Sequence, residues 1–176
     1  RFRESAVVTL GTLMRAPGEG RGAIGRVGGA AYRQTQAIAR LTPGNERDII
    51  RARTQLAAGG FRDPAQEERV LAASLDVGAL NPNESTAQGR FVRALSQIRG
   101  RGKLQAEELN QLGELGVGRG DVFAAIARQR GMTGTAQENQ RRVEALMQRG
   151  QITGDEGTNA ALSAVQGMTG ERLGGF

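Results

Sequence analysis

The sequence contains no cysteine, no histidine and no tryptophan. The first two absences exclude disulfide bonds, thiolate nucleophiles, imidazole general bases and the commonest zinc sites. No apolar run approaches the ~18 residues that a membrane-spanning helix requires, and no charged and apolar signal-peptide pattern opens the chain. We therefore expect a chain that neither crosses a membrane nor uses cysteine or histidine chemistry.

Aromatic residues are also scarce, at 3% of the 176 residues, so a core must be built mainly from Leu, Ala and Val. A chain of this length fits one domain, or one domain with a tail, that could bury roughly 70% of the unfolded surface. Its 24 basic residues, all Arg except Lys103, oppose 18 acidic ones and give a net charge of +6. Such an excess attracts nucleic acids or acidic protein surfaces. Because the chain begins at Arg1 and stops at Gly174-Gly175-Phe176, we expect a piece of a longer polypeptide.

The apolar pattern predicts an all-α fold, a compact bundle of about seven short helices joined by glycine-bearing turns. Residues 1–41 form an N-terminal segment whose first run, Phe2–Met14, fits a short strand or a helix, with helix favoured. Ala16–Ala30 should be a flexible loop, because Pro17 and six clustered glycines cost too much backbone entropy. The helical domain spans residues 42–167, and residues 168–176 form a frayed tail.

Capping residues predict where the helices begin and end. Gly59-Gly60 should end one helix, because glycine adopts the left-handed conformation of a C-cap. Thr135 and Glu138 form a capping box, in which each side chain bonds the other residue's backbone N–H. Pro43 should end the helix before it, and Asp76–Thr86 should form a long connection. The other predicted N-caps, in chain order, are Thr42 or Asn45, Asp63, Ser85 or Thr86, and Asp121.

Two patterns suggest enzyme chemistry, and neither is supported by its context. Gly20–Gly25 matches the G-x-G-x-x-G of a dinucleotide site, with Glu46 placed like a ribose-binding carboxylate, but no strand precedes it. The adjacent carboxylates Glu107-Glu108 and Asp155-Glu156 point about 100° apart on a helix, so neither pair faces one substrate. We expect no enzyme activity, no cofactor and no small-molecule substrate.

Charged residues near helix ends have a structural explanation. Glu107 and Glu108 fit the first turn of a helix, where negative charge complements the helix dipole. The late arginines Arg128, Arg130 and Arg149 complement the carbonyl ends of their helices in the same way.

The most basic turn is Arg99-Gly100-Arg101-Gly102-Lys103. Its cations Arg99, Arg101 and Lys103 form a possible interaction turn, since phosphate contacts alone need no stacking aromatic. Three charges are few for a binding footprint, so a solvated turn is the preferred interpretation. A nucleic-acid-contacting helical module, with possible DNA contact here, is the alternative function.

A specific resemblance covers the same region. The segment from Ala94 to Leu112 reads ALSQIRGRGKLQAEELNQL and is followed by Gly116-Val117-Gly118. A helix ending in Gln-Ile, a Gly-Lys-Leu turn, an acidic Leu-rich helix and a Gly-Val loop, in this order, resemble the tape measure protein of tailed bacteriophages. Gly150-Gln151-Ile152-Thr153-Gly154-Asp155-Glu156 is similar to the family's Gly-Lys-Ile-Ser turn. Further likenesses, nearer the N-terminus, are Phe2-Arg3-Glu4-Ser5, Thr9-Leu10, Thr12-Leu13 and Leu41-Thr42-Pro43.

The resemblance implies a structural function in a phage or phage-derived tail. A tape measure protein lies in the tail lumen of the virion, takes part in tail assembly and tail length determination, and leaves ahead of the genome during ejection. The implied partners are tail tube proteins and tail assembly chaperones, with self-association, after synthesis in the host cytoplasm. Frequent Gly and Pro breaks indicate that this segment is a compact domain of such a protein rather than the ruler itself.

Overall fold

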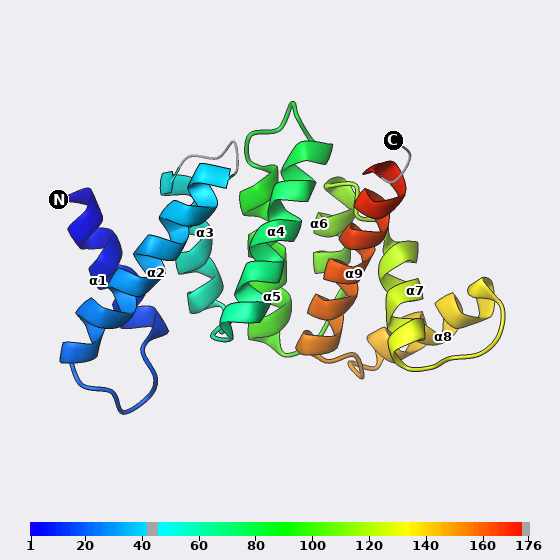
Figure 1. Cartoon of the computed structure of the whole chain (residues 1–176). Coiled ribbons are helices and arrows are strands. Elements are labelled where there is room, and N and C mark those ends of the chain that lie inside the picture. The colour runs from blue at the N-terminus through cyan, green and yellow to red at the C-terminus, as the bar shows by residue number, and fades with distance from the viewer. Residues whose placement is uncertain (42–45, 174–176) are drawn as a thin grey trace. The chain divides into compact units, whose positions relative to one another are not determined.

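A computed structural model describes residues 1–41 and 46–173 of the chain. In this part of the chain the structure contains nine helices and no β-strand. The all-α prediction is therefore confirmed, and the expected number of seven helices is a small miscount. None of the described helices is both long enough and apolar enough to span a bilayer. The helices in Figure 1 are α1 (Phe2–Met14), α2 (Gly22–Leu41), α3 (Glu46–Ala58), α4 (Pro64–Leu80), α5 (Ala87–Arg101), α6 (Ala106–Glu114), α7 (Arg119–Gln129), α8 (Ala136–Gln148) and α9 (Gly154–Leu173).

The chain divides into two compact units, Arg1–Leu71 and Ala72–Phe176, and the division falls within α4. The sequence placed its boundaries elsewhere, at 41/42 and 167/168. The helix α3 accounts for the first difference, because it packs against both α1 and α2 and so belongs with them. The helix α9 continues to Leu173, across the first residues of the predicted frayed tail. The remaining part of the predicted tail, 174–176, lies outside the described residues.

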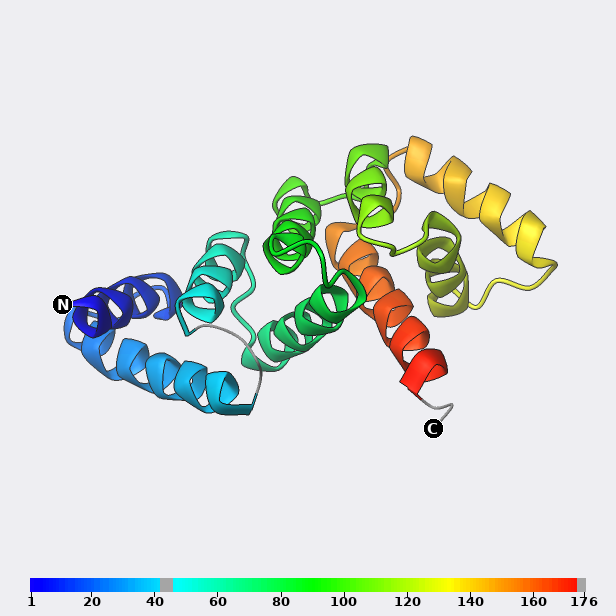
Figure 2. The ribbon, with the colours of Figure 1, turned by 90° about the horizontal axis from the view of Figure 1, so that it is seen from above.

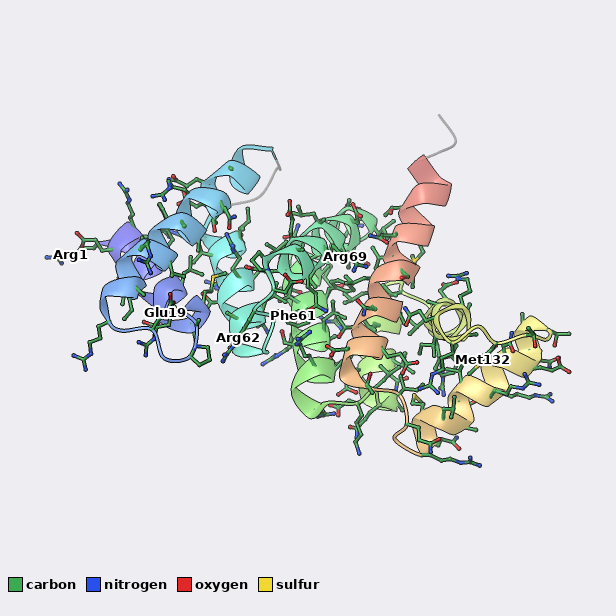
Figure 3. All side chains as sticks on the ribbon, turned by 60° about the horizontal axis from the view of Figure 1, so that its bottom comes forward. Arg1, Glu19, Phe61, Arg62, Arg69 and Met132 are labelled. Atoms are coloured by element: carbon green, nitrogen blue, oxygen red, sulfur yellow. The ribbon has the colours of Figure 1, made fainter. Side chains whose placement is uncertain are left out.

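In the first unit, α1 packs along α2, and the favoured helix for Phe2–Met14 is confirmed. The flexible loop predicted over Ala16–Ala30 is wrong for its second half, because α2 begins at Gly22. One of the glycines in this stretch, Gly28, makes a close helix contact, because a β-carbon on it would lie 1.9 Å from the Val7 carbonyl oxygen of α1. The connection between the two helices keeps Gly18 at φ 92°. The side chain of Glu19, labelled in Figure 3, accepts a hydrogen bond from the Ala16 N–H at 3.0 Å.

The second unit is built around α9, which packs against both α5 and α7. Figures 1 and 2 show α9 lying beside these helices, with α6 next to α5 and α8 next to α7. Its core is rich in Leu, Ala and Val, as the composition predicts, and includes the fully buried side chains of Phe91, Leu95, Ile98, Leu109, Leu112, Ile126, Leu162 and Val165.

The predicted caps have mixed outcomes. The capping box of Thr135 and Glu138 is confirmed, with both reciprocal hydrogen bonds present. Asp63 accepts from the N–H groups of Ala65 and Gln66 at the start of α4, as expected of an N-cap. Gly60 takes φ 88° just after α3, in agreement with the predicted C-cap.

Three boundary predictions are corrected. Thr86 occupies the N-cap position of α5, but its side chain accepts no cap hydrogen bond, since its backbone lies at φ −96° and ψ −4° rather than in the extended region usual for an N-cap. Its hydroxyl donates to the Glu84 carboxylate. Gly118 is the N-cap of α7, which places Asp121 inside the first turn. The connection expected from Asp76 is shorter, because α4 continues to Leu80. The predictions for Thr42, Pro43 and Asn45 lie outside the described residues.

Candidate functional site

Two turns that lie about 50 residues apart in the sequence meet in the second unit. We call residues 102–104, between α5 and α6, and residues 151–154, which follow α8 and end at the first residue of α9, the paired turns. The Leu104 N–H donates to the Ile152 carbonyl at 3.1 Å, and the Gly154 N–H donates to the Gly102 carbonyl at 2.9 Å. These bonds form an isolated antiparallel bridge between Lys103 and Thr153. The two stretches that carry the family resemblance are therefore side by side.

Glycine and buried apolar residues fix this junction. Gly102 and Gly150 take φ 71° and 68°, the left-handed region that lets each preceding helix end. A β-carbon on Gly154 would lie 2.7 Å from the Ile98 carbonyl oxygen, so only glycine fits where α9 starts against α5. Leu104 and Ile152 are fully buried beneath the bridge. The turns are thus part of the core of the unit and not loose connections.

The predicted interaction turn is largely occupied by carboxylates. Arg99 pairs with Asp155 of α9 at 2.9 Å, and Arg101 pairs with Glu107 at 2.9 Å and with Glu108. The side chain of Lys103 is exposed. The structure therefore brings all three predicted cations to the paired turns, but two of them already have negative partners.

The carboxylates of α6 lie in its first turn, where the sequence placed them. The two side chains lie in different environments, because Glu107 is exposed while Glu108 is fully buried. The Oε1 atom of Glu108 accepts from Arg101, whereas its Oε2 atom is buried with no hydrogen-bond partner in the protein. The guanidinium of Arg101 is thus the hydrogen-bond partner of a carboxylate that is removed from water.

Arg130 holds the second turn, and sequence reasoning missed this contact. It follows α7, and its guanidinium donates to both carboxylate oxygens of Glu156 and, from Nη2, to the Gln151 carbonyl at 2.7 Å. These hydrogen bonds hold the pKa of Glu156 below its ordinary value of 4.5, against the opposing effect of partial burial. The sequence explained Arg130 by the end of its own helix, and nothing local in the sequence indicated a partner 26 residues away.

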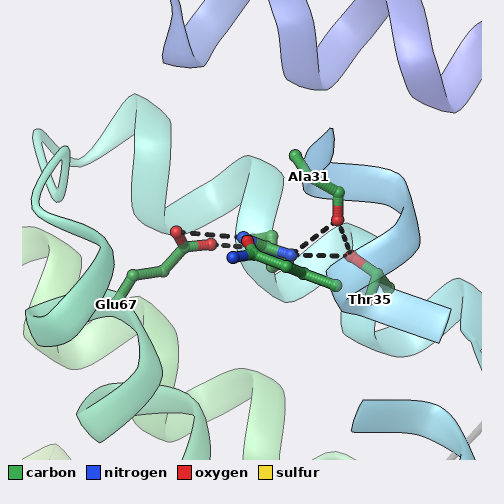
Figure 4. Close-up of polar contacts among 5 residues, drawn as sticks. Ala31, Thr35 and Glu67 are labelled. Atoms are coloured by element: carbon green, nitrogen blue, oxygen red, sulfur yellow. Dashed lines mark hydrogen bonds and ion pairs between the residues drawn. The ribbon is translucent and has the colours of Figure 1, made fainter. Parts of the chain in front are cut away.

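The first unit contains a second polar cluster around Arg53, which is almost fully buried with its partner Glu67 (Figure 4). Nε donates to Glu67 Oε1 at 2.6 Å, and Nη2 donates to Glu67 Oε2 at 3.3 Å. Nη1 donates to the Ala31 carbonyl and to the Thr35 hydroxyl, at 2.7 and 2.9 Å, and Nη2 also donates to the Gln34 side chain at 3.2 Å. All five guanidinium N–H groups are satisfied, and one side chain joins α2, α3 and α4.

A hollow of about 260 Å³ adjoins this cluster, lined by Gln34, Ala37, Arg53, Pro64, Glu67, Glu68 and Leu71. Because every N–H of Arg53 is already bonded within the protein, the arginine offers no free donor to an anionic ligand. A sequence signal for the cluster existed: Arg53 shares the spacing of the buried Ile49, Ile50, Leu56 and Ala57 on α3. An arginine on the apolar side of a helix is informative because buried charges are almost always paired.

The structure does not assemble a site from the other candidate residues of the sequence. Gly22 and Gly25 of the G-x-G-x-x-G match lie within α2, and the element before them is the helix α1 rather than a strand. Across the described residues, no group of three or more acidic side chains is placed to hold a metal ion.

These features define a class: an all-α helical protein whose second unit is closed by two paired helix-turn-helix junctions. Comparison with family models, with curated proteins and with solved structures gave no match.

Proposed function

We propose that this chain is a structural domain of a tape measure protein in a phage or phage-derived tail. The observation that supports this most directly is the meeting of the Gly102-Lys103-Leu104 turn and the Gln151-Ile152-Thr153 turn. Both turns belong to the stretches of sequence that resemble that family. Two motifs that recur in one order in a family are expected to be joined if they maintain one fold.

The structure also explains why the motif contains these residue types at these positions. Glycine permits the left-handed turn, and Leu104 and Ile152 fill the core below it. The acidic start of α6 supplies carboxylates for Arg101. None of these tasks needs a substrate, which is consistent with a structural role rather than with catalysis.

Within such a protein, we infer that this domain serves assembly contacts or ejection rather than length measurement. Its described helices have between 9 and 20 residues and fold back on one another, so chain length does not translate into axial length here. Partners of this class would be tail tube proteins, tail assembly chaperones or another copy of the chain, and the place of action would be the tail lumen of the virion.

The test is tail morphology in particles whose parent gene lacks residues 72–173 in frame. A ruler segment of about 100 residues at 1.5 Å each would shorten tails by about 150 Å. The proposal expects instead tails of normal length with impaired assembly or failed ejection. If deletion leaves both tails and infectivity intact, the tape measure proposal is wrong.

Two glycine variants of full chain length distinguish the effect of losing the fold from the effect of shortening the chain. Gly154→Val should reproduce the deletion phenotype, because its β-carbon would meet the Ile98 carbonyl oxygen. Gly100→Ala, on the α5 surface with nothing within 4 Å of the added carbon, should leave the tails as in the wild type. Equal phenotypes for the two would argue against a role for the folded domain.

The alternative is a nucleic-acid-contacting module, and the observation in its favour is the uneven distribution of charge. Residues 1–71 contain twelve arginines and seven acidic residues, so most of the net charge of +6 lies in the first unit. DNA binding that weakens steeply with salt would support this function, and a smaller salt slope after Arg99→Ala and Arg101→Ala would place contacts at the turn. Absence of binding at low salt would remove the alternative.

A further inference from the structure

The two helix-turn-helix units that meet at the paired turns have one loop spacing in common. Gly102 lies six residues before Glu108, and Gly150 lies six residues before Glu156, with nearly equal φ angles of 71° and 68°. The twelve-residue calcium loop of an EF-hand has the same spacing, with glycine at position 6 for the sharp turn and a bidentate glutamate at position 12. Both turns therefore share the glycine-to-glutamate spacing of a calcium loop, while the residues at its first positions belong to the last turns of α5 and α8.

The remaining ligand positions do not fit calcium. An EF-hand loop supplies oxygen ligands from positions 1, 3 and 5 as well. The corresponding residues here are Gln97, Arg99 and Arg101 in the first turn and Ala145, Met147 and Arg149 in the second. Three of these six side chains carry positive charge and two are apolar, so the wild-type loops lack the donor set of a calcium site.

In the second turn a guanidinium contacts the oxygens that calcium would use. Position 7 of an EF-hand loop contributes its backbone carbonyl, and position 12 contributes its carboxylate. Those groups are the Gln151 carbonyl and the Glu156 carboxylate, and Arg130 donates to both of them. The pair is mostly shielded, since the side chains of Arg130 and Glu156 are 31% and 16% exposed.

The first turn also has an arginine on its position-12 carboxylate, but this arginine is Arg101 of the loop itself, which pairs with Glu107 as well. Arg101 donates to the carboxylate of Glu108, at position 12, and to the side-chain oxygen of Gln105, at position 9, the latter at 3.0 Å. Glu108 is fully buried, and an uncompensated buried carboxylate would be strongly destabilising. Some cation is needed at this place, and the chain supplies one.

We propose that Arg101 and Arg130 are built-in substitutes for a bound metal ion, so that this pair of turns closes permanently and without metal. In calcium sensors the helix pair opens and closes with the ion. Here the cation is covalently part of the chain, and the closed state does not follow calcium concentration. Removal of the Arg130 side chain would leave the oxygens of Gln151 and Glu156 open to a hard divalent cation, which favours oxygen ligands.

Amide hydrogen exchange at Leu104 and Gly154 tests the proposal, because these two N–H groups form the bridge. The full chain is compared with its Arg130→Ala variant, each with calcium chloride, with chelator, and with sodium chloride of matched ionic strength. We expect wild-type protection to be equal in all three conditions. In R130A protection should fall by about tenfold or more in chelator and in sodium chloride. Millimolar calcium should restore part of it, because the Gln151 carbonyl and the Glu156 carboxylate are the freed ligands.

Arg119→Ala is the matched control, since Arg119 pairs with Glu144 at 2.6 Å in the same unit and neither residue belongs to the paired turns. Its bridge protection should resemble the wild type, without a calcium effect. Arg130→Lys provides a milder change if R130A does not fold: the ammonium should keep part of the protection and leave no place for calcium.

Four results would overturn the proposal. Wild-type protection that depends on calcium would mean that a metal and not arginine closes the turns. Unchanged protection in R130A would mean that the guanidinium is not needed. Failure of calcium to restore R130A, or a calcium effect in R130K, would show that the vacated place is not a cation site.

Discussion

Gly28 of α2 lies so close to Val7 of α1 that a β-carbon on Gly28 would stand 1.9 Å from the Val7 carbonyl oxygen. Gly11 of α1 makes the complementary approach, since its β-carbon would lie 2.1 Å from the Ile24 carbonyl oxygen. In both contacts the obstacle is backbone, which cannot rotate away as a side chain can. The α1–α2 interface is therefore a backbone-to-backbone contact that requires glycine on each helix.

Replacement of Gly28 by alanine should destabilise the first unit by roughly 1–3 kcal/mol, because the added methyl group overpacks the interface. Gly25→Ala is the matched control on the same helix, with nothing within 4 Å of its added carbon. That variant should gain roughly 0.5–1 kcal/mol from helix propensity. Urea unfolding of both variants measures the difference, and equal effects would contradict close packing at Gly28.

Loss of the Arg53 side chain should destabilise the first unit by about 3–5 kcal/mol, because Glu67 would be left as a buried, uncompensated charge. Arg51→Ala, an exposed arginine on the same helix, should change the free energy of unfolding by no more than about 0.5 kcal/mol. The double variant R53M with E67L should cost less than R53A alone, because both charges are then removed. Thermal and urea unfolding would decide, and a larger loss in the double variant would refute a charge-based explanation.

The ion pair of Glu156 with Arg130 should stop stabilising the folded state at acid pH. Arg130 lowers the pKa of this carboxyl in the folded state, so its stabilisation is present above the ordinary value of 4.5 and is lost as pH falls through the folded pKa. The wild type should therefore be more stable than its Glu156→Gln variant at neutral pH, and the two should converge well below pH 4.5. Urea unfolding across this pH range provides the measurement. A difference that persists in acid would assign the effect of E156Q to packing.

Asp76 on α4 should show the opposite sign. Burial raises the pKa of this carboxyl above its ordinary value of 3.8, so the folded state binds the proton more tightly than the unfolded state. The ionised form therefore costs stability as pH rises through the folded pKa. Asp76→Asn should be more stable than the wild type at neutral pH and equal to it below pH 3.8. Stabilisation by D76N that does not vary with pH would contradict desolvation as the cause.

Local signals in the sequence predicted the helices with good accuracy. A sequence pattern is enough to find a feature that depends on neighbours within a few residues. Such features are the N-cap at Asp63, the capping box at Thr135 and the left-handed turn at Gly60. The errors occurred where a local pattern has two explanations. Clustered glycine before Ala30 indicates either a loop or a close helix contact, and only the presence of α1 against it decides.

The sequence identified the residues of the two turns but not the contact between them. Arg99, Arg101 and Lys103 were identified as a unit because they are contiguous, and the turn at Gly150 was identified by its resemblance. Their pairing was not predictable, since it depends on how α5 and α9 pack. Arg130 and Arg53 were missed as site residues because their partners lie 26 and 14 residues away along the chain.

The sequence by itself determined the all-α class, the Leu-, Ala- and Val-rich core and most helix ends, because these follow from composition, periodicity and contacts between near neighbours. Tertiary structure decided which turns meet, which glycines allow helices to touch and which arginines are neutralised. Those outcomes depend on long-range packing, which brings Lys103 to Thr153 and Arg130 to Glu156, and no local propensity encodes a partner at that distance.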